Sequence, residues 1–515
     1  MPMFSVPSSL KRQLLNLLTV VAALAASLAL LNSWFQAPPQ TQLDLFQTNL
    51  ALQAARTLDV PDYQPFAQAL LGSDVVSLAS KRYEKATASL EERLTQMQQL
   101  ISPASGSAPT PIPEVAASEL KPLSGAPDPA PSRLNFLGKE LDALHLRTGI
   151  LKAYLGDLEA AEMNWQNMQT PDLAETASVV RGLWGTPRRI LPEAERQLRE
   201  NLSGWFEGIT LQRLFSLQQR SDALTMLNQE QEQLAISALM RLSLVSGIPL
   251  LGLGLGLLIL IGWQVQQVWS KRAFLGAAWE VPWEGADVQA VLTGWFLSFL
   301  ILGQWVPKLY LILLKIPSGQ LSYWQQAGEL FLTYTSGALA GLAIIYAVVR
   351  VYRPLPSDLF CFRLFDHWPL WGIGGYLAAM PLVLLASAIS ELFLSQGGGG
   401  NPLLPVILQS QGWGPRLLFL LVVSVCAPVF EELLFRGFLF SSLTRYLSKG
   451  SALVVSALLF AVAHLNLSDL LPLTMLGLIL GVIYSHSRNL LAPMLLHSLW
   501  NAGSLVALLI LGNSR

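Results

Sequence analysis

The sequence predicts an all-α fold: a polytopic bundle of membrane-spanning helices with a large soluble helical insert between the first and second spans. Hydrophobic residues make up 52% of the 515 residues and charged residues only 13%. The mean hydropathy is +0.44. These values are typical of multi-span membrane proteins and not of soluble enzymes with one anchor. Apolar runs of spanning length recur along the chain, and one long polar stretch interrupts them.

The first apolar run extends from about Leu14 to Leu31, close to the roughly 20 residues that a spanning helix needs. Lys11 and Arg12 precede it, which favours a signal anchor whose N-terminus stays in the cytoplasm. We therefore expect residues 1–35 to form an N-terminal transmembrane anchor. Frequent alanine and serine residues leave a cleaved signal peptide as the alternative.

Residues 36–240 form the predicted insert, because charged and amide side chains appear there at helical spacing with apolar ones. A stretch rich in Pro, Ala and Ser, 102–132, cannot hold a regular helix and is expected to be a mobile linker. Residues 148–162 resemble one helix-turn-helix unit of a tetratricopeptide repeat. One unit does not make an array, so an ordinary helical hairpin and a docking surface for a protein partner or substrate both stay open.

Beyond residue 240 the chain divides into additional transmembrane helices, 241–365, and a C-terminal membrane core, 366–515. With the first anchor, the apolar segments suggest about nine spans: 243–264, 288–314, 328–349, 369–393, 415–447, 451–466, 469–486 and 489–512. Tryptophans at 279, 283, 295 and 305 are expected at membrane interfaces.

Basic residues set the predicted orientation of these spans. They fall on one side if the spans alternate: Lys11, Arg12, Lys271, Arg272, Arg350, Arg353, Arg445, Lys449 and Arg488. That side is expected to be cytoplasmic, which places the insert and the loop at Gly397–Gly400 on the other side.

Composition also narrows the class of function. The formal net charge of -1 gives no basic excess, so we expect no nucleic-acid partner. The two cysteines, Cys361 and Cys426, lack the spacing of a metal finger or a redox motif.

Polar residues inside the C-terminal spans are the strongest clue to function, because ionisable groups are costly in a bilayer. Glu431 and Glu432 directly follow the apolar run Leu417–Phe430, and Arg436 lies four residues after the second. Two further segments contribute Phe460 with His464 and His497 with Asn501, again four apart and so on one helical face.

Helical rise places these groups at similar depths. Measured from the basic inner boundary at roughly 1.5 Å per residue, Glu431 lies about 21 Å deep, His464 about 22 Å and His497 about 14 Å. They can then meet in one layer, provided that Pro415–Ser448 is a single long helix, which Pro428 is expected to kink. From the residues alone, a transporter or proton relay and a non-catalytic membrane scaffold stay open beside an enzyme.

The three motifs, Glu-Glu-x-x-x-Arg, Phe-x-x-x-His and His-x-x-x-Asn, resemble those of the CPBP intramembrane proteases, which include the type II CAAX prenyl endopeptidases and bacteriocin-processing or self-immunity proteins. The resemblance covers about residues 370–512. It implies an intramembrane endopeptidase that hydrolyses a peptide bond with a glutamate-activated water. The implied roles are a base, Glu431, assisted by His464; oxyanion donors, His497 and Asn501; a supporting pair, Glu432 and Arg436; and a cavity-lining ring, Phe460.

The resemblance also bears on cofactors and partners. Because the family is often described as metalloproteases, a zinc ion on Glu431, His464 and His497 stays open. The preferred interpretation requires no cofactor, since a histidine and an asparagine four residues apart suit oxyanion binding. The expected partners are the lipid bilayer and a membrane protein or lipidated peptide as substrate.

Overall fold

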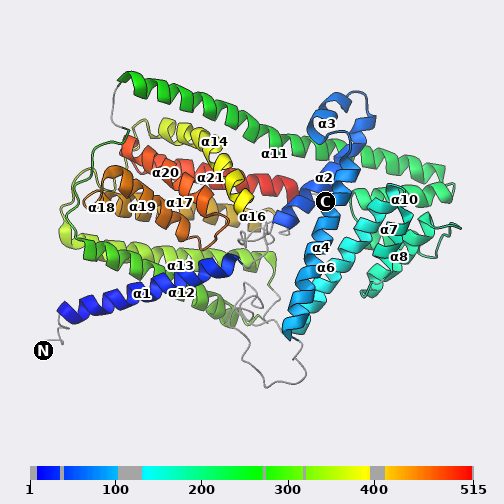
Figure 1. Ribbon diagram of the computed structural model, residues 1–515, viewed down its shortest axis with the longest axis horizontal. Coiled ribbons are helices and arrows are strands. Elements are labelled where there is room, and N and C mark those ends of the chain that lie inside the picture. Colours follow the sequence, from blue (N-terminus) through cyan, green and yellow to red (C-terminus); the bar gives the residue numbers. More distant parts are fainter. Residues whose placement is uncertain are drawn as a thin grey trace. The chain divides into compact units, whose positions relative to one another are not determined.

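The computed structural model describes residues 8–34, 40–101, 130–166, 168–270, 274–316, 321–394 and 412–512. All regular secondary structure in these residues is helical, which confirms the predicted class. Contacts divide the chain into two compact units. Unit 1 is formed mainly by Met1–Pro39 and Pro249–Leu509, and unit 2 mainly by Gln40–Pro122 and Ala126–Ile248 (Figure 1).

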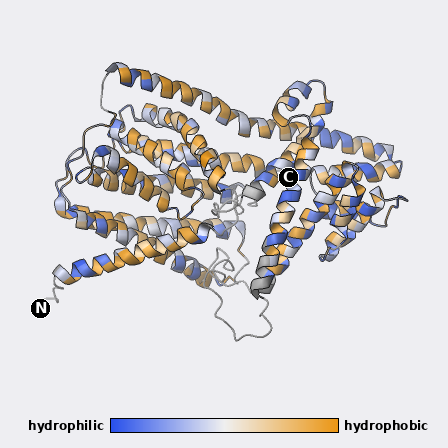
Figure 2. Cartoon of the chain, viewed as in Figure 1, coloured by the Kyte–Doolittle hydropathy of each residue, from blue (hydrophilic) through white to orange (hydrophobic). Residues whose placement is uncertain are grey.

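Within the described residues, eight helices or helical segments are long and apolar enough to cross a membrane, and they stand out by their hydropathy in Figure 2. They are α1 (Ser8–Trp34), α11 (Ser221–Ser270), α12 (Gly285–Leu314), α13 (Tyr323–Val349), α14 (Trp368–Leu394), the segment Trp413–Leu443, α20 (Leu470–Ser487) and α21 (Leu491–Gly512). A shorter apolar helix, α19 (Lys449–Val462), has 14 residues. The protein is thus an integral multi-pass membrane protein.

All regular secondary structure in the described residues of unit 2 is helical, so a helical insert does follow the first span. Its helices are α2 (Gln40–Ala54), η1 (Ala55–Asp59), α3 (Gln64–Leu71), α4 (Val75–Ile101), α6 (Ala130–Tyr154), α7 (Leu158–Trp165), α8 (Pro171–Trp184), α9 (Ala194–Asn201), α10 (Trp205–Leu217) and the first part of α11. They enclose a core of fully buried apolar side chains that includes Ile150, Leu183 and Leu211.

Two predictions for the insert, the end of the linker and the helix-turn-helix, can be compared with α6. The predicted linker ends at residue 132, but α6 already begins at Ala130. Residues 102–129 lie outside the described residues. The helix-turn-helix expected at 148–162 is present as the end of α6, a turn, and α7. Gly156 occupies that turn at φ +91°, a conformation that glycine adopts without steric cost.

Close helix packing in unit 1 uses two of the glycines of α11. A Cβ at Gly252 would overlap Met380, and one at Gly256 would overlap the carbonyl of Leu377, both on α14. Glycines four apart lie on one face and let two helices approach closely. The same helix continues through Pro249 without interruption.

The helix that carries the glutamate pair differs from the prediction. It comprises α16 (Trp413–Leu421), a π-helical stretch (Val422–Cys426), α17 (Ala427–Glu432), a second π-helical stretch (Leu433–Phe440) and α18 (Ser441–Leu443). It therefore ends at Leu443 and does not extend to Ser448. Near this end the hydroxyls of Ser441 and Ser442 hydrogen-bond main-chain carbonyls one turn back, which is typical of hydroxyl side chains that compete with regular helix.

The connection between α11 and α12, residues 274–284, corrects the expectation for two tryptophans. Trp279 and Trp283 are 4% and 0% exposed, so they are core residues and not interface anchors. The Trp283 indole donates to Ser442 Oγ at 2.6 Å. Arg445 donates to the Trp283 carbonyl, also at 2.6 Å, and Lys449 to that of Gly276 at 2.9 Å. Basic side chains at this end of unit 1 thus hold the connection against the bundle.

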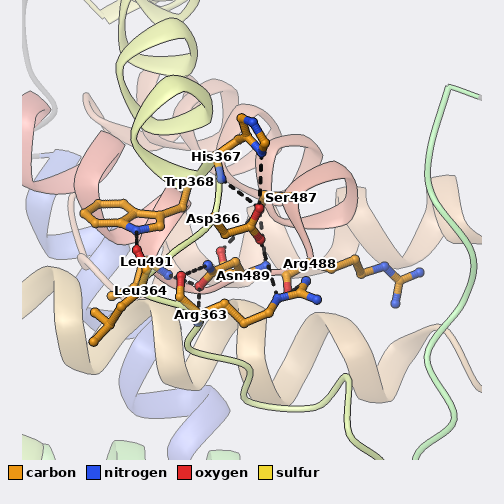
Figure 3. Close-up of polar contacts among 9 residues, drawn as sticks. All are labelled: Arg363, Leu364, Asp366, His367, Trp368, Ser487, Arg488, Asn489 and Leu491. Carbon is orange, nitrogen blue, oxygen red and sulfur yellow. Dashed lines mark hydrogen bonds and ion pairs between the residues drawn. The ribbon is translucent and has the colours of Figure 1, made fainter.

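A second junction fixes the start of α21 (Figure 3). Asn489 Nδ2 donates to the carbonyl of Arg363 at 2.7 Å, and Arg363 Nη2 donates to the carbonyl of Arg488 at 3.2 Å. Arg488 pairs with Asp358 at 3.2 Å. Nearby, the backbone N–H of His367 donates to Asp366 at 2.7 Å and lowers the pKa of that carboxyl. The loop before α14 is thereby tied to the α20–α21 turn.

Candidate active site

Glu431 lines a small cavity of about 190 Å³ within unit 1. The other lining residues come from α12, α13, the glutamate helix and the segment just after α19: Trp295, Phe296, Phe299, Leu300, Tyr334, Phe430, Phe435, Ala463, His464 and Leu465. Glu431 Oε1 accepts a hydrogen bond from the Tyr334 hydroxyl at 3.1 Å. Its other oxygen, Oε2, is buried and has no hydrogen-bond partner among the described residues. A carboxylate oxygen is therefore left available to a bound molecule.

Glu432 lies beside the cavity in a fully buried charge network. Its Oε1 accepts from Arg436 Nη1 and from His497 Nδ1, each at 2.8 Å. The side chains of Glu432 and Arg436 are 0% and 1% exposed. Arg436 also donates to the carbonyl of Gly477 on α20 at 3.2 Å. The adjacent glutamates thus face different partners, as expected for neighbouring helical positions.

His497 connects the two carboxylates. Since its Nδ1 donates to Glu432, the ring orientation is fixed and Nε2 is left for other partners. Nε2 lies 3.8 Å from Glu431 Oε2. This separation is too long for a direct hydrogen bond. It is suitable for a water molecule that hydrogen-bonds to both atoms.

His464 lies just past the end of α19 and lines the same cavity as Glu431. Its Nδ1 is 2.9 Å from the carbonyl of Phe460. This contact assigns the Nδ1 proton and leaves Nε2 as the acceptor in the neutral ring. The structure therefore brings together three of the residues singled out in the sequence: Glu431, His464 and His497.

Phe460 does not line the cavity, which differs from its expected role. It is 0% exposed, and its ring packs between charged and imidazole groups. The guanidinium carbon of Arg436 lies 4.4 Å from the ring centre, and the rings of His464 and His497 lie at 5.0 and 5.6 Å. Phe460 supports the orientation of these groups from behind the cavity wall.

Asn501 has a different partner from the one expected. Its Nδ2 donates to the carbonyl of Val423 at 2.8 Å. In the π-helical stretch the N–H of Ala427 donates to the carbonyl of Val422, five residues back. The same pattern would pair the carbonyl of Val423 with the N–H of Pro428, but proline has no N–H. The Val423 carbonyl would otherwise lack a partner, so Asn501 satisfies it and ties α21 to the glutamate helix.

Replacing Asn501 with alanine is expected to lower the free energy of unfolding by about 1–3 kcal/mol, because the partly buried Val423 carbonyl loses its donor. Reversible unfolding of the purified protein in mixed detergent micelles measures this. Ser504→Ala is the matched control, since Ser504 is an exposed residue on the same helix that bonds only to its own turn. Equal stabilities for the two variants would contradict the assigned role.

The sequence did not predict that α12 and α13 form part of the cavity wall. Tyr334, Trp295 and Phe299 precede the predicted core at 366–515, yet all three line the cavity. Tyr334 is one of several hydroxyl residues in a predicted span, beside Thr333, Thr335 and Ser336. Nothing in the sequence distinguishes its hydroxyl from theirs.

The zinc site that the resemblance left open does not assemble here. Within the part of the chain that the structure describes, no three His, Cys, Asp or Glu side chains are arranged as a metal-ligand set. Nδ1 of His497 and Nδ1 of His464 are each engaged by the protein, so only Nε2 of each ring could face a ligand. The reaction proposed below includes no step through a metal.

Comparisons with known proteins agree with the motifs. Residues 413–503 match the family model described as Type II CAAX prenyl endopeptidase Rce1-like. This match and the relatives confirm the predicted resemblance to the CPBP intramembrane proteases. The membrane-embedded CAAX protease MroQ of Staphylococcus aureus is 25% identical over 210 residues, which cover 39% of this chain and 82% of MroQ.

Two shorter matches extend the comparison. The UPF0177 protein YxdF of Lactococcus lactis is 36% identical over 91 residues, covering 17% of this chain and 50% of YxdF. YdiL of Bacillus subtilis, a candidate membrane peptidase, is 26% identical over 163 residues, covering 31% of this chain and 66% of YdiL. The chain thus spans less than two thirds of each of these two proteins. No solved structure matches.

Proposed function

Since residues 413–503 match the Rce1-like family model, we propose that the chain is an intramembrane endopeptidase of the CPBP type in which Glu431 activates a water molecule. One observation carries the proposal. The unpartnered oxygen of Glu431 lies 3.8 Å from Nε2 of His497, and Glu431 shares its cavity with His464. A base and two imidazoles are thereby available to one buried water.

The proposed reaction moves one proton in and out of Glu431. Glu431 Oε2 takes a proton from water, and the resulting hydroxide attacks the carbonyl carbon of the substrate, with Nε2 of His464 as a second acceptor that orients the water. The tetrahedral intermediate carries an oxyanion. In its imidazolium form His497 donates from both ring nitrogens, from Nδ1 to Glu432 and from Nε2 to that oxyanion. Glu431 then protonates the departing amine as the C–N bond breaks.

The buried ion pair has a supporting part in this reaction. Arg436 and His497 both donate to Glu432 Oε1, so the carboxylate fixes the imidazole orientation and offsets an imidazolium charge. Asn501 contributes by positioning α21 against the glutamate helix. Its amide would reach an oxyanion only by leaving Val423.

The cavity also limits the substrate class. Its wall is mostly aromatic and aliphatic, and its volume of about 190 Å³ is below the roughly 300–1,000 Å³ of pockets that enclose whole ligands. We propose that a membrane protein or lipidated peptide inserts one peptide bond and a neighbouring apolar side chain, while the rest of the substrate stays outside.

The experiment that tests this function compares membrane peptides from cells that express either the wild-type protein or Glu431→Gln. New protein termini that depend on Glu431 would support the protease and identify its substrates. If no Glu431-dependent terminus forms, while reconstituted vesicles lose a solute flux in the same variant, the residues serve a transporter instead. If neither readout changes, the bundle is a scaffold.

Tyr334→Phe is expected to lower the cleavage rate about tenfold, because the hydroxyl that orients Glu431 is lost while the ring stays in place. The measurement is the initial rate of cleavage of one identified substrate by the reconstituted protein. Tyr346→Phe on the same helix is the control, since Tyr346 is 55% exposed and does not line the cavity. Equal cleavage rates for the wild type, Tyr334→Phe and Tyr346→Phe would show that the Tyr334 hydroxyl has no role in the reaction.

A further inference from the structure

A second cavity lies in unit 2, apart from the proposed peptidase site. It has a volume of about 510 Å³, and its lining is more polar than apolar. The α6–α7 turn, the α8–α9 loop and α10 form it. The lining residues that matter here are two arginines, Arg188 and Arg213, and two aromatic residues, Tyr154 and Trp184. A cavity of this volume is within the range of ligand-binding pockets.

In the described part of the chain, the two arginines of the cavity lack an acidic partner, unlike four other arginines of unit 2. In the same unit Arg181, Arg196, Arg199 and Arg220 each pair with a glutamate. Among the described residues, neither Arg188 nor Arg213 forms an ion pair with a carboxylate. Positive charge therefore gathers in the cavity without compensation from the protein itself.

Two contacts orient Arg213. Its Nε donates to the carbonyl of Leu183 at 3.4 Å, and its guanidinium lies 5.7 Å from the centre of the Trp184 ring. Within the described part of unit 2, neither terminal nitrogen of Arg213 has a hydrogen-bond partner, so both can face a ligand. Arg188 lines the same cavity as Arg213. Partial burial and the neighbouring charge of Arg188 lower the pKa of Arg213.

The loop that carries Arg188 is anchored to α8. The Gly185 N–H bonds to the carbonyl of Arg181, and the Arg189 N–H bonds to that of Gly182, each at 2.8 Å. A Cβ at Gly182 would lie 2.6 Å from the Arg189 carbonyl oxygen, so only glycine allows the loop to fold back this far. These backbone hydrogen bonds and the close approach at Gly182 therefore position Arg188 beside the cavity.

From this arrangement, we propose that the cavity binds the carboxylates of an acidic peptide segment. A guanidinium fork matches a carboxylate in two parallel hydrogen bonds. Trp184 and Tyr154 supply flat apolar surfaces for a neighbouring side chain. The inference goes beyond the proposed peptidase activity, because it gives unit 2 a recognition role that does not depend on Glu431.

The test uses the full-length protein in detergent micelles and a fluorescein-labelled hexapeptide of glutamate and leucine with a free C-terminus. Fluorescence anisotropy is expected to show saturable binding, with a dissociation constant below about 1 mM. Binding should weaken at least about tenfold in Arg188→Gln and in Arg213→Gln. The matched control, Arg196→Gln, removes an exposed arginine of the same unit and should leave binding unchanged.

Two further peptides identify the source of the carboxylate. Weaker binding of an amidated peptide would assign the C-terminal carboxylate, and weaker binding of a glutamine peptide would assign the side chains. The proposal is overturned by any of three results: the wild type shows no saturable binding, the double variant Arg188→Gln with Arg213→Gln binds as well as the wild type, or inorganic phosphate displaces acidic and glutamine peptides alike. Should Arg213→Gln not fold, the exposed Arg188→Gln variant still decides the outcome. Cleavage of a short membrane peptide without acidic residues is expected to stay unchanged in both variants.

Discussion

Replacing Glu431 with glutamine is expected to reduce the rate of peptide cleavage about 10²–10⁴-fold, the range that a positioned general base contributes. Glutamine keeps the size of the side chain and can still accept from Tyr334, but it cannot take a proton from water. The measurement is the single-turnover rate with an identified substrate and reconstituted protein. Because Glu431 has one unpartnered oxygen in a cavity, the fold should tolerate this neutral side chain.

Glu391→Gln is the matched control for that variant. Glu391 is an exposed glutamate near the end of α14, so its loss should change neither rate nor stability measurably. The Glu431→Gln protein should unfold in the same detergent range as the wild type. If it also cleaves within tenfold of the wild-type rate, Glu431 is not the general base.

Replacing Glu432 with glutamine is expected to lower the free energy of unfolding by about 3–5 kcal/mol, because Arg436 is left as an uncompensated buried charge. Both side chains are almost completely buried, so water cannot replace the lost carboxylate. The double variant Glu432→Gln with Arg436→Met should recover part of the loss, since it removes both charges. Reversible unfolding in mixed detergent micelles measures each step.

An exposed pair in unit 2 provides the comparison for the buried one. Arg196 and Glu200 have the same i, i+4 spacing, but their side chains are each 54% exposed. Glu200→Gln should therefore cost less than about 1 kcal/mol. If Glu432→Gln costs as little as Glu200→Gln, the buried network does not hold the helices in the way described.

Much of the fold could be predicted because a bilayer requires long apolar helices. The predicted apolar segments coincide with the eight spanning helices and α19, and the all-α class follows from the need to satisfy backbone groups within each helix. What local patterns could not show was how the chain between helices would fold back. Trp279 and Trp283 are of the residue type that is enriched at membrane interfaces, yet long-range contacts with the glutamate helix bury them.

The candidate site could be predicted where chemistry and helical spacing agree. Costly polar groups in apolar helices singled out Glu431, His464 and His497, and the structure brings them together. Two features depended on details that the sequence leaves open. The partner of Asn501 follows from the carbonyl that Pro428 leaves unpaired, and the contact of Tyr334 depends on which face of α13 meets the glutamate helix.

The central claim is that Glu431 activates water and does not itself attack the peptide bond. A single turnover in oxygen-18 water, followed by mass spectrometry of both the product and the enzyme peptide that contains Glu431, tests it directly. We expect one oxygen-18 atom in the new carboxyl terminus of the product and none in Glu431. Label in the Glu431 carboxylate would show that an acyl-enzyme had formed there and been hydrolysed, which would contradict the mechanism.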